Sequence, residues 1–253
     1  AVNGKIIRKI HSSAKGGHLD DLSYVESAGT WSSDSRALAF SVSFDGYPTR
    51  VYVAEWNRGG PRMRELRRPG GVSVRGGSLR WRPGSRDLCF IGEQQARARL
   101  QAFTGVRDGG QGRTVTLTPG DVTVERYDFS ASADTRVVIT STPTDPPDLY
   151  RVDDDGALQR LTRVNPQVET WKLPQIQHVS WTGADGDPCH GILELPPGYE
   201  KGDGPLPTII ELHGGPTSSS KYRLRLWIYG RALMASKGYA LLSPNYHGST
   251  GYG

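Results

Sequence analysis

The chain has 253 residues, of which 36% are hydrophobic and 23% are charged. This length favours two domains, and the composition supplies enough apolar side chains for a folded core. The apolar stretches are no longer than a strand, which excludes a membrane-spanning helix. The two cysteines exclude a disulfide scaffold or a structural zinc cage. The net charge is +5, and residues 58–86 are rich in arginine. Because acidic residues are scattered along the chain, we expect a mixed-charge surface, with no nucleic-acid partner and no membrane partner.

Residues 1–165 contain a pattern that occurs three times. An aromatic residue, a short polar turn and an apolar strand-like run recur with anchors at Trp31, Trp81 and Phe129, which are 50 and 48 residues apart. Two further strand-like runs follow in each repeat, at 51–55 and 63–68, at 99–103 and 114–120, and at 148–152 and 158–164. Four short strands in a repeat of about 48 residues are typical of a β-propeller blade. A β-sandwich with accidental similarity is the alternative.

The length of this region limits the number of blades. Residues 1–165 have room for roughly three and a half blades, whereas propellers close with about four to eight. Residues 4–10 have the pattern of the last strand of a blade whose beginning is missing. We therefore expect a partial propeller over 1–165 that continues before residue 1.

The pattern changes after Pro166. Residues 176–199 predict two strands joined by a turn at Asp185–Asp187, and 207–216 predict an apolar strand that stops in a glycine-rich turn. Residues 224–234 have helical periodicity and are followed by a glycine at 238, which indicates a helix end. Residues 239–245 predict another strand with almost no polar face, as in a parallel sheet covered by helices. We therefore expect an α/β domain that begins in 166–253 and is incomplete there.

Two motifs carry a resemblance to a known family. The HGGP sequence at 213–216 and the GYALLSPNYHGSTGYG sequence at 238–253 resemble the start of the catalytic domain of prolyl oligopeptidase family serine peptidases, in particular the acylaminoacyl-peptidase-like branch. The resemblance implies a β-propeller followed by the first part of an α/β-hydrolase domain. It also implies hydrolysis of short peptides without a cofactor. His247 stands where the family usually has arginine, which we interpret as a change in local packing or hydrogen bonding.

The resemblance also implies the roles of the HGGP residues. The amide of Gly215 is expected to be one donor of the oxyanion hole, Gly214 to give the turn its geometry, and His213 and Pro216 to fix the loop. A tight turn without chemistry is the alternative. No Gly-x-Ser-x-Gly nucleophile motif occurs in the sequence, and Ser249 has the wrong spacing. We therefore expect the whole Ser-Asp-His triad beyond residue 253.

Other polar clusters carry no predicted site. The remaining histidines share no metal-ligand spacing, so no metal is expected: His11, His18, His178, His190 and His247. Asp20-Asp21 and the acidic run at 153–156 predict turns. The leading hypothesis is a fragment of a serine peptidase that is itself inactive. The alternatives are a non-catalytic propeller binding module fused to a degenerate hydrolase domain, and an esterase on the same fold. The family branch and the few cysteines favour the cytoplasm, while the oligomeric state is not determined.

Overall fold

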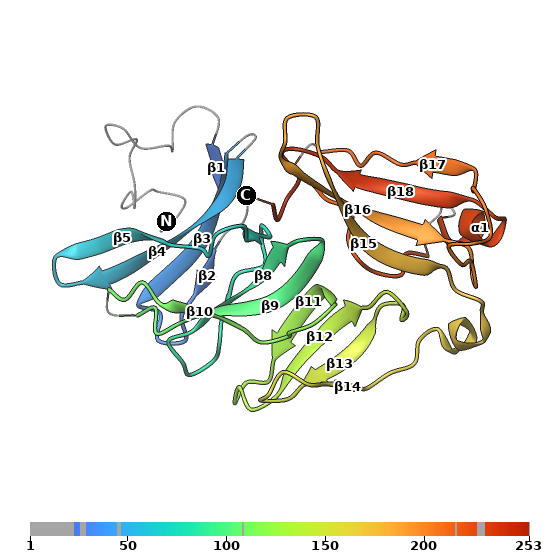
Figure 1. Cartoon of the computed structure of the whole chain (residues 1–253). Coiled ribbons are helices and arrows are strands. Elements are labelled where there is room, and N and C mark those ends of the chain that lie inside the picture. Colours follow the sequence, from blue (N-terminus) through green and yellow to red (C-terminus); the bar gives the residue numbers. More distant parts are fainter. Residues whose placement is uncertain are drawn as a thin grey trace.

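The computed structural model describes residues 23–25, 29–44, 47–107, 109–215, 217–226 and 231–252, which form three sheets (Figure 1). The first sheet has the strand order β1-β3-β4-β5, with β2 paired to β3 and every pairing antiparallel. Its strands are β1 (Ser23–Val25), β2 (Thr30–Trp31), β3 (Ala37–Phe44), β4 (Tyr47–Asn57) and β5 (Gly60–Leu66). The strands follow one another as a meander because only two residues separate β3 from β4 and β4 from β5.

The second sheet contains two more antiparallel groups. The first group is β6 (Ser73–Val74), β7 (Arg80–Trp81), β8 (Leu88–Gln94), β9 (Arg97–Thr104) and β10 (Arg113–Thr116). The second group is β11 (Thr123–Phe129), β12 (Arg136–Ser141), β13 (Asp148–Val152) and β14 (Leu158–Arg160). A single parallel pair, Thr123 with Ala98, connects the two groups. The repeat seen in the sequence therefore corresponds to three successive meanders, with the anchors Trp31, Trp81 and Phe129 each at the end of a strand.

The three anchors differ in burial. Trp81 is 6% exposed and its indole N–H donates to the carbonyl of Thr30 in the first sheet. Trp31 is 52% exposed and contacts Trp56, with ring centroids 5.1 Å apart. Trp81 and Trp31 occupy the same position in the repeat but differ in burial, because Trp81 lies between two described sheets.

Strand β8 is buried on both faces. Phe90 belongs to the core shared with the first sheet and stacks on Phe103 at 4.6 Å. Cys89 and Ile91 point the other way, into the core shared with β11 and β12. Because successive side chains of a strand point to opposite faces, the apolar run of β8 fills two cores at once.

The third sheet has the order β15-β16-β18-β17. After a short 3₁₀ helix, Pro166–Thr170, its elements are β15 (Gln175–Thr182), β16 (Pro188–Leu195), β17 (Thr208–Ile210), α1 (Arg231–Ser236) and β18 (Ala240–Asn245). The sheet is mixed, which corrects the expectation of a parallel one. Among its described strands, only β17 and β18 are parallel, because a crossover joins them, whereas a hairpin makes β15 and β16 antiparallel.

Of the predicted helix over 224–234, residues 224–226 are irregular, 231–234 are helical, and 227–230 lie outside the described residues. Helix α1 is described over Arg231–Ser236, and Gly238, whose positive φ of 91° fits the predicted helix end, follows it. Leu224 is outside it, in an irregular segment, and its amide donates to the carbonyl of Thr142 at 2.7 Å. Its side chain is buried with Ala96, Val168, Ile176 and Ile192. The apolar periodicity there reflects packing between the second and third sheets and not a helix. Within the described residues, no helix has the length and apolar character needed to span a bilayer.

Candidate oxyanion loop

The HGGP loop begins where β17 ends. Strands β17 and β18 are parallel, with Ile210 opposite Leu242, so the segments that follow them leave from the same edge of the sheet. One segment carries His213, Gly214 and Gly215, and the other is 246–252. The carboxyl ends of parallel strands are the usual place for ligand sites in α/β proteins.

Gly215 is the glycine that the loop geometry requires. Its φ is +143°, and a Cβ added there would lie 2.8 Å from the amide nitrogen of Thr217. A Cβ at Gly214 would meet nothing within 4 Å. The expected assignment of the turn geometry to Gly214 therefore does not fit, because the tight approach of the backbone occurs one residue later.

The amide of Gly215 has no partner among the residues that the structure describes. The residue is exposed, and its neighbours His213, Gly214 and Ser218 line a cavity of about 690 Å³. A backbone N–H without a partner on an exposed turn can donate to a negative oxygen. Pro216, the fourth predicted residue of the loop, lies outside the described residues.

His213 is held by three neighbours. Its Nδ1 is 3.1 Å from the carbonyl of Gly214, which can only accept, so Nδ1–H donates there. The hydroxyl of Ser249 is hydrogen-bonded to Nε2 at 2.9 Å. Tyr246 stacks on the imidazole at 4.4 Å, and its hydroxyl donates to the carbonyl of His213. His213 thus shapes the loop with both its ring and its backbone.

Ser249 is not placed as a nucleophile, which agrees with its spacing in the sequence. It is 3% exposed, and its hydroxyl is used in the bond to His213. The sequence pattern gave no role to this serine, because the test applied to it was the nucleophile motif alone. Ser249 and His213 are 36 positions apart in the sequence, so no local motif indicates their contact.

Basic side chains follow the loop at alternate positions. Lys221 is 2.7 Å from Glu93, Arg223 pairs with Glu125, and Arg225 is 3.9 Å from Glu211. Each cation therefore faces a carboxylate. Glu93 and Glu125 belong to the second sheet, so these pairs hold the segment after the oxyanion loop against that sheet.

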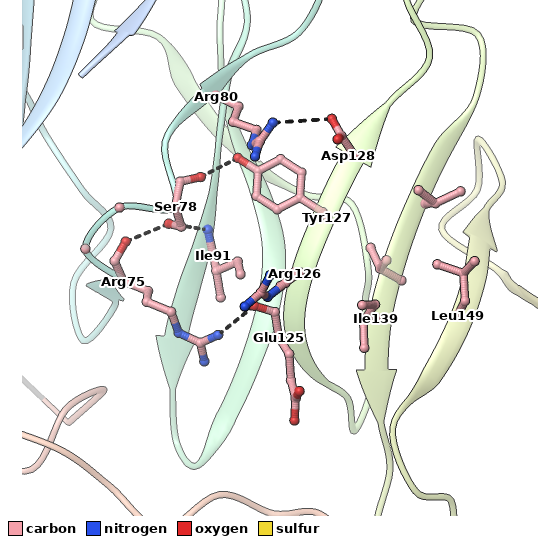
Figure 2. Close-up of a pocket in the computed structure, with 14 residues that line it drawn as sticks. Arg75, Ser78, Arg80, Ile91, Glu125, Arg126, Tyr127, Asp128, Ile139 and Leu149 are labelled. Atoms are coloured by element: carbon pink, nitrogen blue, oxygen red, sulfur yellow. Dashed lines mark hydrogen bonds and ion pairs between the residues drawn. The ribbon is translucent and has the colours of Figure 1, made fainter. Parts of the chain in front are cut away.

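A second cavity, of about 520 Å³, opens beside β11 and β12 (Figure 2). Several of its polar side chains bond to one another or to backbone: Tyr127 donates to the carbonyl of Ser78 at 2.5 Å, and Arg80 is 3.4 Å from Asp128. Because the expected oxyanion residues line the other cavity, the cavity at the HGGP loop is the better candidate site.

The predicted turns are present where the structure describes them. The acidic run at 153–156 closes the β13–β14 hairpin, with the amide of Gly156 donating to the carbonyl of Asp153 at 3.0 Å. Asp20-Asp21, His11 and His18 lie outside the described residues. His178 and His190 stack at 5.4 Å. Burial, with the positive charge of Arg97, lowers the pKa of His178 to about 4.

His247 has acidic neighbours that its sequence position does not indicate. Its ring nitrogens lie 3.5 Å from Asp185 and 3.8 Å from Asp187, and all three side chains are exposed. The trio has the donor atoms of a possible metal site, whereas the sequence expectation was no metal. The tertiary structure brings these residues together from the β15–β16 turn and the segment after β18. Their exposure is also that of ordinary surface ion pairs.

Known proteins similar to the chain are peptidases. It is 28% identical over 230 residues to dipeptidyl-peptidase 5 of Porphyromonas gingivalis, which covers 88% of the chain and 32% of that relative. It is 28% identical over 188 residues to the acylamino-acid-releasing enzyme of Sus scrofa, covering 68% and 24%. The chain therefore spans less than a third of the length of these curated relatives. No protein-family model matches it.

Solved structures give the same result for the fold. The uncomplexed acylaminoacyl peptidase of Pyrococcus horikoshii matches with a TM-score of 0.68 and 21% identity, over 87% of this chain and 32% of that one. Dipeptidyl peptidase 4 of Porphyromonas gingivalis matches with a TM-score of 0.65 and 16% identity, over 88% and 30%. The fold expectation is thus confirmed in outline, as a sheet-rich chain with the fold of peptidases that join a propeller to a hydrolase domain. The relatives confirm the resemblance to the prolyl oligopeptidase family.

Proposed function

We propose that this chain is part of a serine peptidase of the prolyl oligopeptidase family, in which the amide of Gly215 is one donor of the oxyanion hole. The whole enzyme would hydrolyse short peptides through an acyl-enzyme, as a dipeptidyl- or acylaminoacyl-type peptidase. The names of the relatives, dipeptidyl-peptidase and acylamino-acid-releasing enzyme, support this substrate class.

The proposal rests on the exposure of Gly215 and on its backbone N–H. The residue is exposed and its N–H has no partner among the described residues, on a turn that leaves the carboxyl end of a parallel strand. A donor fixed in this way costs no reorganisation when negative charge develops on the substrate oxygen. One such donor contributes about 2.7–4 kcal/mol to transition-state binding.

The sheet order supports the place of the missing nucleophile. Strand β17 ends the third sheet and pairs only with β18 among the described strands. A further parallel strand on its free side would bring a nucleophile next to Gly215. The proposed enzyme therefore carries a Gly-x-Ser-x-Gly motif within about a hundred residues after Gly253, followed by Asp and then His. The amide after that serine would be the second oxyanion donor.

The proposed architecture is a propeller portion over 1–165 and the start of the hydrolase domain over 166–253. The three meanders of β1–β14 support three blades, and residues 4–10, outside the described residues, would supply part of another. The change from meanders to a mixed sheet between β14 and β15 supports a boundary near Pro166. The proposed count of about three and a half blades follows from these observations.

The experiment is covalent labelling with a fluorophosphonate probe. The full-length protein should be labelled at the serine of its Gly-x-Ser-x-Gly motif and should hydrolyse dipeptidyl or acylaminoacyl substrates. Residues 1–253 alone should stay unlabelled, because the segment holds one oxyanion donor and no triad. An unlabelled full-length protein would support the non-catalytic binding module instead. Labelling of any serine within 1–253 would show that the nucleophile is misplaced here.

A further inference from the structure

We propose that Glu93, at the end of strand β8, is a positioning residue for the oxyanion loop and acts through Thr250 and Ser249. This inference rests on the proposed function. It assigns to the propeller a direct part in holding the oxyanion hole.

The carboxylate of Glu93 is buried and is bonded by three donors. Lys221 lies 2.7 Å away, Arg75 also 2.7 Å away, and the hydroxyl of Thr250 donates to it at 2.9 Å. Burial raises the pKa of Glu93, but the two cations outweigh that effect and lower the pKa to about 2. Glu93 therefore remains charged at neutral pH. It binds Arg75 from its own sheet and Lys221 and Thr250 from the region of the third sheet.

The segment after β18 is fitted closely onto the β8–β9 hairpin. The amide of Gly251 donates to the hydroxyl of Ser73 at 3.0 Å, and the amide of Gln95 donates to the carbonyl of Gly251 at 3.0 Å. Gly251 has a φ of +88°, and a Cβ there would lie 3.0 Å from the backbone of Gln94 and Glu93. Only glycine fits such a position. Figure 1 shows this segment running from the third sheet back toward β8 and β9.

The same segment holds the oxyanion loop. Ser249 is hydrogen-bonded to the imidazole of His213 at 2.9 Å, and Tyr246 donates to the carbonyl of His213. The amide of Thr250 donates to the carbonyl of Ser218 at 2.8 Å. The loop is thus bonded on both sides of Gly215, and the residue that makes one of these bonds also bonds Glu93.

A second set of contacts runs in parallel. Lys221, which pairs with Glu93, also donates to the hydroxyl of Ser219, and Ser219 is 2.9 Å from the hydroxyl of Thr250. The amide of Tyr222 donates to the carbonyl of Ala96 at 2.8 Å. Displacing Glu93 would therefore release two anchors of the residues that flank Gly215. Because misplacement by about 1 Å can cost about a hundredfold in rate, the effect should appear in kcat.

The test uses two variants of the full-length enzyme, one on each side of the junction. Glu93→Gln keeps the size of the side chain and removes its charge, and Ser249→Ala removes the bond to His213. We expect each to lower kcat by about tenfold or more with KM within about twofold, because the loss falls on the transition state. Binding of a peptide aldehyde, whose adduct places an oxyanion in the hole, should weaken by a similar factor.

Controls separate positioning from general destabilisation. Glu65→Gln, on β5 of the first sheet, also removes a carboxylate that pairs with an arginine, Arg50 at 3.3 Å, and should leave kcat unchanged. The double variant Glu93→Gln/Ser249→Ala should lose less than the product of the single effects, because both act through one chain of contacts. If Glu93→Gln fails to fold, Thr250→Val, which removes the hydroxyl that donates to Glu93, takes its place and should lower kcat by a similar factor.

The outcomes distinguish this inference from the proposed function. Wild-type protein that is neither labelled by fluorophosphonate nor active overturns the proposed function and this inference with it. An active wild type whose two variants keep kcat within twofold overturns the inference alone. A rise in KM at constant kcat also overturns it, since it would assign Glu93 to substrate binding.

Discussion

The sheets of β1–β14 and the sheet of β15–β18 bury their apolar side chains to different extents. In the first region, β8 fills a core on each of its faces, and Phe90 and Phe103 are 0% exposed. In the second region, Ile210 is 63% exposed and Leu212 is 68% exposed. Other large apolar side chains of that region are exposed as well: Trp181, Leu226, Leu233, Met234 and Tyr239.

This difference follows from the two architectures. A repeated meander packs against the meanders next to it in sequence, so part of an array already has cores. A sheet of the α/β type needs helices on both faces and further strands at its edge. Among the described residues, α1 is the only α-helix beside the third sheet. We interpret the exposed apolar side chains as the surface that later elements of the proposed hydrolase domain would cover.

Two buried glutamates show the same contrast in electrostatics. Glu93 has Lys221 and Arg75 as partners, and its pKa is lowered to about 2. Among the described residues, the carboxylate oxygens of Glu194, on β16, have no hydrogen-bond partner, and Arg231 lies 3.6 Å away. Burial outweighs the charge of Arg231 and raises the pKa of Glu194 to about 7. The region with exposed apolar surface is thus also the one with an incompletely compensated charge.

The largest expected effect is on the free energy of unfolding. Phe90→Ala should destabilise the full-length protein by about 3–5 kcal/mol, because it removes a fully buried ring between two sheets. Leu212→Ala, on the exposed segment after β17, is the matched apolar truncation. Because we interpret Leu212 as covered by later elements, this truncation should cost about 2–5 kcal/mol in the full-length protein, although Leu212 is exposed here. Urea unfolding followed by circular dichroism measures both. A loss within about 0.5 kcal/mol for Leu212→Ala would contradict that interpretation.

The second prediction concerns the rate of the proposed reaction. Gly215→Val should lower kcat by about a hundredfold or more and change KM less, because the added side chain collides with Thr217 and displaces an oxyanion donor. Gly202→Val, at an exposed position before β17 where a Cβ meets nothing within 4 Å, should leave kcat unchanged. A fully active, folded Gly215→Val enzyme would mean that HGGP is only a turn.

The third prediction is a pH dependence of stability. Because the pKa of Glu194 is higher in the folded state than in the unfolded chain, folding favours its protonated form. Its contribution is fully present below about pH 4.5 and is lost as the pH rises through about 7. Relative to Glu194→Gln, the wild type should lose about 3 kcal/mol across this window. Denaturant unfolding at a series of pH values measures the difference. A constant difference between the two proteins would contradict the raised pKa.

The smallest effect is on thiol reactivity. Cys89 is 0% exposed, and burial raises its pKa to about 12, whereas Cys189 on β16 is partly exposed. Iodoacetamide should therefore modify Cys189 at least about tenfold faster than Cys89 in the native protein. Peptide mass spectrometry measures the two rates, and both thiols should react at similar rates in denaturant. Equal rates of alkylation of Cys89 and Cys189 in the native protein would contradict the difference in their burial.

Part of the structure could be predicted from local patterns. The spacing of Trp31, Trp81 and Phe129 gave the repeat, because an aromatic followed by a turn and an alternating run specifies a strand pair within a few residues. The β13–β14 turn and the helix end at Gly238 were predicted on the same basis. The HGGP loop was found through a resemblance, and its oxyanion role stays a prediction. The helical periodicity of Leu224 and Leu226 was misleading, since neither residue is helical: Leu224 packs between sheets and Leu226 is exposed.

The sequence by itself determined the strands, the turns and the change of pattern near Pro166, because those depend on neighbouring residues. Only the tertiary structure brought Ser249 to His213, His247 to Asp185 and Asp187, and Thr250 to Glu93. The last two residues are 157 positions apart, and no spacing rule relates them. Their contact depends on how the third sheet docks against the β8–β9 hairpin. That docking is stabilised by the shared burial of Ala96 with Leu224 and by the ion pair of Glu93 with Lys221. Both interactions form only when the two surfaces meet, so neighbouring residues in the sequence do not indicate them.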